Sequence, residues 1–113
     1  MAQDKLVIIW TSRDREVALN MVFMYAKNSR LKGWWPNVTL VIWGPSAELL
    51  CQDQSLWPEL KALQEVGVET LACRACADRY STTAALEDLG VKVIYMGQPL
   101  TDYLKTGLPV LTF

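Results

Sequence analysis

Histidine is absent from this chain of 113 residues. Its absence excludes Ser-His-Asp and Cys-His catalysis, and also every zinc site that uses imidazole as a ligand. The chain has three cysteines, fewer than the four ligands that a structural zinc ion takes. Neither a G-x-G-x-x-G loop nor a P-loop occurs, so no nucleotide or flavin site is indicated. We therefore expect neither a metal nor an organic cofactor.

The sequence also lacks an excess of charge and a long apolar run. It has 11 Lys+Arg against 12 Asp+Glu, a balance that gives no reason to expect nucleic acid or an anionic membrane as a partner. The apolar runs are far shorter than the ~20 residues of a membrane span, and Leu6–Trp10 is too short for the core of a secretory leader. With an odd number of cysteines, this predicts free thiols and a cytoplasmic protein.

Strand-like and helix-like segments alternate along the chain, of which 51% is hydrophobic. Nearly continuous apolar segments are typical of parallel strands that are covered on both faces. The pattern predicts one domain over residues 1–113, a three-layer α/β/α fold with a mostly parallel, five-stranded sheet and right-handed crossovers. The expected strands are 6–10, 38–43, 68–72, 91–96 and 109–113. The expected helices are 15–30, 46–51 with Ser46 as cap, 56–66, 74–89 with a break near Ser81-Thr82, and 100–105.

Ligands of such sheets gather beyond the carboxyl ends of the strands. The loops expected there are Thr11–Asp14, Gly44–Ser46, Cys73–Cys76 and Gly97–Pro99. Ser12, Gly44 and Gly97 are therefore candidate binding residues. A hydroxyl at Ser12 can hold an anion at the start of the first helix, or it can cap that helix.

The segment Cys73-Arg74-Ala75-Cys76 is the most informative part of the chain. We expect Cys73 at the end of a strand and in the first turn of a helix, where free backbone N–H groups and the helix dipole favour a thiolate. Arg74 and Arg79 add positive charge, and the thiolate is the reactive form of cysteine. A reactive Cys73 must be partly open to solvent. Three interpretations remain: a nucleophile with Cys76 as resolving or auxiliary thiol, two buried structural cysteines, or a thioredoxin-like dithiol.

The chain resembles the small DsrE-like proteins of the DsrE/DsrF and YchN group over its whole length. The resemblance rests on the order of the five strands, the Gly44-Pro45 turn, Cys73–Ala77 after the third strand and the Met96-Gly97 turn. It implies a protein that relays sulfane sulfur as a persulfide on Cys73, acting with a donor or acceptor protein and assembling as a trimer or hexamer. Cys76 is extra relative to those proteins. A non-catalytic binding or structural module is the alternative.

Two further features concern packing. In residues 17–26 every side chain except Asn20 is apolar, so we expect this helix to be covered by a second copy of the chain. Trp34-Trp35 is an anchor for a partner or a cover for the end of the core. Cys51 is expected to pack in the core.

Overall fold

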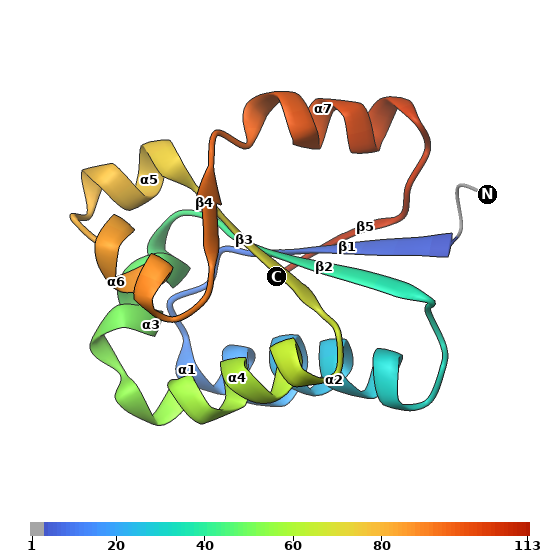
Figure 1. The fold of residues 1–113 in the computed structure, drawn as a ribbon, viewed down its shortest axis with the longest axis horizontal. Coiled ribbons are helices and arrows are strands. Elements are labelled where there is room, and N and C mark those ends of the chain that lie inside the picture. Colours follow the sequence, from blue (N-terminus) through green and yellow to red (C-terminus); the bar gives the residue numbers. More distant parts are fainter. Residues whose placement is uncertain (1–3) are drawn as a thin grey trace.

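A computed structural model describes residues 4–113 and confirms the expected fold class (Figure 1). Five parallel strands form one sheet in the order β4-β3-β2-β1-β5. Each predicted strand end lies within two residues of the observed one. The strands are β1 Lys5–Trp10, β2 Asn37–Ile42, β3 Glu69–Cys73, β4 Lys92–Ile94 and β5 Val110–Thr112.

Helices cover both faces of this sheet. The N-terminal helix is continuous over residues 15–31 and consists of α1, η2 and α2. It lies with α4 on one face of the sheet, and α7 lies on the other, while α3, α5 and α6 lie near the carboxyl ends of the strands (Figure 1). The helical elements are α1 Arg15–Val17, η2 Ala18–Phe23, α2 Met24–Leu31, α3 Pro45–Gln52, η3 Gln54–Leu56, α4 Trp57–Glu65, α5 Arg74–Arg79, α6 Thr83–Asp88 and α7 Gly97–Lys105.

Each face of the sheet carries its own apolar cluster because side chains alternate along a strand. In β3, Ala72 belongs to the larger cluster, under the N-terminal helix and α4. Leu71 and Cys73 belong to the smaller cluster, which Leu100 and Tyr103 of α7 cover. The alternation in β3 therefore directs Cys73 to the α7 side of the sheet.

The N-terminal helix differs from the expected regular helix in two ways. Its turns at η2 are π-helical, and the carboxylate of Asp14 caps it by accepting the N–H groups of Glu16 and Val17. The hydroxyl of Ser12 accepts the N–H of Asp14 at 3.0 Å. Ser12 thus supports the capping residue rather than capping the helix itself.

Ser46 is not the cap of α3, which corrects the sequence-based expectation. Gly44 holds that position with φ +78°. The Ser46 hydroxyl, fully buried, donates instead to the carbonyl of Trp10 at 2.5 Å. It thereby ties the turn after β2 to the end of β1.

The break expected near Ser81-Thr82 is confirmed. Ser81 has φ 58° and separates α5 from α6. Helix α4 ends at Glu65, one residue before the expected end, and Gly67 follows it with φ 93°, a conformation typical of the residue after a helix. The last helix begins at Gly97 rather than Leu100, because Pro99 still lies in its first turn, where no intrahelical N–H bond is lost. Within residues 4–113, no helix is long and apolar enough to cross a membrane.

Candidate functional site

Cys73 is the last residue of β3 and the N-cap of α5, as the sequence predicts. Its backbone is extended, with φ −72° and ψ 117°. The residue is 6% exposed and packs in the smaller apolar cluster with Met96, Trp43 and Cys76. The partial exposure that a reactive Cys73 was expected to have is therefore not observed.

The cap geometry of Cys73 corrects a second expectation. Among the described residues, its side chain accepts no hydrogen bond from the N–H groups of α5. The side chain instead follows the strand alternation into the cluster on the α7 side. Any stabilisation of a Cys73 thiolate must come from other neighbours.

Cys76 is a direct neighbour of Cys73. It lies one helical turn after Cys73, is partly exposed, and its thiol is hydrogen-bonded to the Cys73 side chain. The backbone N–H of Gly44 donates to the sulfur of Cys76. The structure thus brings three of the predicted site residues together: Cys73 at the end of β3, Cys76 in α5, and Gly44 in the turn after β2.

The pKa of Cys76 is raised, first by burial and then by negative charge on Cys73 and by the hydrogen bond to it. The Gly44 N–H and the positive charge of Arg79 act in the opposite direction. The raising effects prevail. The thiol of Cys76 therefore keeps its proton to a higher pH than an ordinary cysteine does.

The two arginines have different surroundings. The guanidinium of Arg74 donates to the carbonyl of Val93 at 2.9 Å and lies 4.0 Å from the carboxylate of Glu87, so it braces β4 and α6. Arg79 is exposed in the last turn of α5 and its charge reaches Cys76. Of the two, Arg79 is the one that the electrostatics link to the thiol pair.

Ser12 and Gly97 lie at the same end of the sheet but have other partners. The backbone N–H of Ser12 donates to the carbonyl of Phe113, beside the edge strand β5. Because β2 separates β1 from β3, Ser12 stands two strand spacings, roughly 10 Å, from the strand of Cys73. Gly97 is exposed at the start of α7, and its carbonyl accepts the hydroxyl of Thr101.

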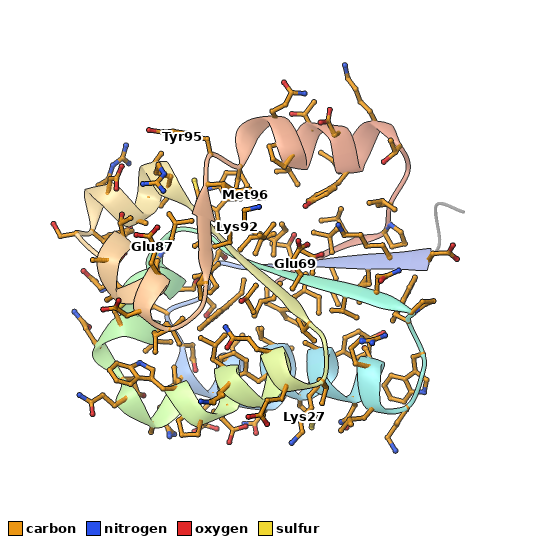
Figure 2. The ribbon with its side chains drawn as sticks, in the orientation of Figure 1. Lys27, Glu69, Glu87, Lys92, Tyr95 and Met96 are labelled. Carbon is orange, nitrogen blue, oxygen red and sulfur yellow. The ribbon has the colours of Figure 1, made fainter. Side chains whose placement is uncertain are left out.

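Met96 is a site neighbour that the sequence analysis placed only at the end of the expected strand 91–96 and in the Met96-Gly97 turn. It is buried, 1% exposed, in the cluster that contains Cys73. Figure 2 shows Met96 at the end of β4 next to Tyr95, which projects outward and is 68% exposed. The signal for this contact is an apolar residue just beyond the carboxyl end of β4, the strand that pairs with β3 and places Ile94 opposite Cys73.

Other candidates lie apart from the thiol pair. Cys51 is half-buried in α3 against the larger cluster, close to the expected core position, and burial raises the pKa of its thiol. A groove of about 620 Å³ runs along α4 and the end of α6 and includes Trp57 and Lys61, but neither cysteine of the pair. Among the described residues, no cluster of three or more Cys, Asp or Glu side chains is placed to hold a metal ion.

An exposed apolar surface lies on the N-terminal helix and beside β5. A shallow groove of about 320 Å³ is lined there by Met21, Met24, Tyr25, Trp34, Leu111 and Phe113, among others. Met24 and Trp34 are 55% and 54% exposed. Trp35 is half-buried against the larger cluster, and its indole N–H donates to the hydroxyl of Tyr25. The two adjacent tryptophans therefore differ in burial: Trp34 is exposed, whereas Trp35 covers the core.

A solved structure is similar to this chain: that of BT1422, a conserved protein of unknown function from Bacteroides thetaiotaomicron, whose sequence is 36% identical to this one. Its TM-score to this chain is 0.95, over 97% of this chain and 95% of that one. The chain belongs to the same family as BT1422. The ychN protein from E. coli is 14% identical with a TM-score of 0.70, over 98% of this chain and 99% of that one, a likeness of fold alone. No protein-family model and no curated protein matched the sequence.

Proposed function

We propose that this protein is a DsrE-like carrier of sulfane sulfur, built as a single domain over residues 1–113, and that Cys73 holds the sulfur as a persulfide. In the loading step the Cys73 thiolate attacks the outer sulfur of a donor persulfide, R–S–SH. The bond between the two donor sulfurs breaks, Cys73–S–SH forms, and R–S⁻ leaves. The oxidation state of the transferred sulfur does not change, so the step needs no separate oxidant.

The observation that carries the proposal is the contact between the two thiols. Cys76 keeps a proton beside Cys73 and is hydrogen-bonded to it. The cluster around the pair is apolar and includes Met96 and Trp43, and surroundings with little water strengthen such a hydrogen bond.

The burial of Cys73 supports the alternative, a non-catalytic module whose cysteines are structural. A structural buried cysteine is inert until the protein unfolds. Native-state alkylation with iodoacetamide near neutral pH separates the two functions, with Cys51 as the internal control because it is also free and partly covered. The carrier requires stoichiometric alkylation of Cys73 in the folded chain, faster than that of Cys51. Modification of Cys73 that begins only on unfolding supports the module instead.

We also propose a cytoplasmic homo-oligomer, a trimer or a hexamer, that acts with a sulfur donor or acceptor protein. The apolar surface around Met24 and Leu111 supports the assembly, because exposed patches of this kind mark contacts between chains. The symmetry rests on the resemblance to DsrE-like proteins. Met24→Glu places a charge in the surface and is expected to reduce the mass measured by sedimentation while circular dichroism stays unchanged. A wild-type chain that sediments as a monomer at micromolar concentration contradicts the proposal.

A further inference from the structure

We infer that Cys76 resolves the Cys73 persulfide, so that the carried sulfur leaves as hydrosulfide and the two cysteines close into a disulfide. This inference rests on the proposed function, because it needs a persulfide on Cys73. It assigns to Cys76 a chemical role in the fate of the sulfur. The carried sulfur then leaves the chain as a small anion at the sulfide oxidation level, with no acceptor protein in that step.

The position of the two thiols supports the step. Their side chains are in hydrogen-bond contact, at the N-cap of α5 and one turn into it. Side chains three residues apart on a helix have Cβ atoms about 5–6 Å apart, and a disulfide needs about 3.5–4.5 Å. Cys73 has an extended backbone outside the helix, so rotation at Cys73 can close the remaining distance while α5 stays intact.

The step balances in atoms and electrons. The Cys76 S–H proton passes to the terminal sulfur of Cys73–S–S⁻, and the resulting Cys76 thiolate attacks the Sγ of Cys73. The bond between that Sγ and the terminal sulfur breaks, HS⁻ leaves, and the Cys73–Cys76 bond forms. The carried sulfur is reduced and the two cysteine sulfurs are oxidised. A second turnover needs a dithiol reductant to reopen the disulfide.

The surroundings of Cys76 match each stage of this step. Burial and the neighbouring sulfur hold the proton on Cys76 until an acceptor is beside it. The Gly44 N–H and the charge of Arg79 stabilise the thiolate once the proton has moved. Cys76 is the more exposed member of the pair, whereas Cys73 is 6% exposed. The persulfide on Cys73 is therefore closer to its partner thiol than to bulk solvent.

The test uses the full chain with Cys51→Ser, so that the pair holds the remaining cysteines, and adds Cys76→Ser and Cys73→Ser variants of it. Each is treated with glutathione persulfide that carries isotopically labelled outer sulfur, then desalted and analysed by intact mass and by labelled sulfide. Serine keeps a hydroxyl donor beside the remaining sulfur, and Cys76→Ala repeats the measurement without it. Glutathione disulfide is the control oxidant, because it can close the pair but contains no sulfane sulfur.

We expect the parent chain to lose two hydrogens and to release one labelled hydrosulfide per chain above the Cys73→Ser background. The Cys76→Ser chain retains one added sulfur on Cys73, with complete loss of that release. Retention of the added sulfur by the parent as long as by Cys76→Ser overturns the inference and leaves the carrier function standing. A disulfide formed without labelled hydrosulfide also overturns it. Failure of both chains to take up sulfur contradicts the carrier function itself.

Discussion

Two buried serines allow the contribution of one hydrogen bond at the site to be measured against a matched control. Ser46 and Ser29 are both 0% exposed. The hydroxyl of Ser46 donates to the carbonyl of Trp10 at 2.5 Å, whereas the hydroxyl of Ser29 has no hydrogen-bond partner within the described part of the chain. The same change, serine to alanine, therefore has opposite expected effects at the two positions.

For Ser46→Ala we expect the free energy of unfolding to fall by about 1 kcal/mol, the usual value of a neutral hydrogen bond. The loss stays small because the Trp10 carbonyl also accepts the N–H of Trp43 at 3.0 Å, so no acceptor is left bare. For Ser29→Ala we expect an equal or higher free energy of unfolding. That change removes an unsatisfied buried hydroxyl and improves the helix propensity of α2 by about 0.5 kcal/mol.

Urea unfolding followed by tryptophan fluorescence measures both variants, since the chain has five tryptophans. At this size a change of 1 kcal/mol moves the midpoint of thermal unfolding by about 4 °C, which gives a second readout. The Ser46→Ala chain should also show altered reactivity at Cys76, because Ser46 holds the turn that presents the Gly44 N–H. Equal destabilisation by the two changes, or a larger loss for Ser29→Ala, would refute the reasoning.

Three further changes test other parts of the account. Gly44→Ala should lower the free energy of unfolding by about 1–3 kcal/mol, because Gly44 has φ +78° and ψ −138°, a conformation that is strained for alanine. An added Cβ meets no described atom within 4 Å, so the loss comes from the backbone conformation and not from a clash. An unchanged free energy of unfolding in urea would contradict this argument. Burial raises the pKa of Cys51, so the folded protein loses stability as the pH rises above the ordinary thiol pKa of about 8.5. Cys51→Ser should make the free energy of unfolding less dependent on pH in that range. The same dependence on pH in the variant and the parent would show that Cys51 is not its cause. Trp35→Ala should cost about 2 kcal/mol and Trp34→Ala less than about 1, since only Trp35 packs on the core; the reverse order in urea unfolding would show that Trp34 has the structural role.

The strands could be predicted because their sequences are apolar at nearly every position, as in Leu6–Trp10, a pattern that buried parallel strands require. The end of α4 before Gly67 and the break between α5 and α6 at Ser81 were also predictable, because local backbone preferences determine both. These features depend on residues close together in the chain. They can therefore be predicted without knowing which distant segments of the chain are in contact.

The features that the sequence did not reveal depend on distant contacts. Ser46 bonds to Trp10, 36 residues away, and so it is not a cap. The N–H of Gly44 reaches Cys76 only because the turn after β2 has one particular backbone conformation. The burial of Cys73 depends on Met96 after β4 and on the cover that α7 provides. The π-helical turns at η2 likewise follow no local pattern of residues that the sequence analysis could use.

The measurement that tests the central claim most directly is the site at which sulfur is gained. Chains with Cys76→Ser, with Cys73→Ser and with Cys51→Ser are treated with glutathione persulfide, blocked with iodoacetamide and analysed by peptide mass. The account predicts one added sulfur on Cys73 in the Cys76→Ser chain, and none on any cysteine of the Cys73→Ser chain. Uptake on Cys51 or Cys76 that is independent of Cys73, or no uptake on Cys73 in the folded protein, would contradict it.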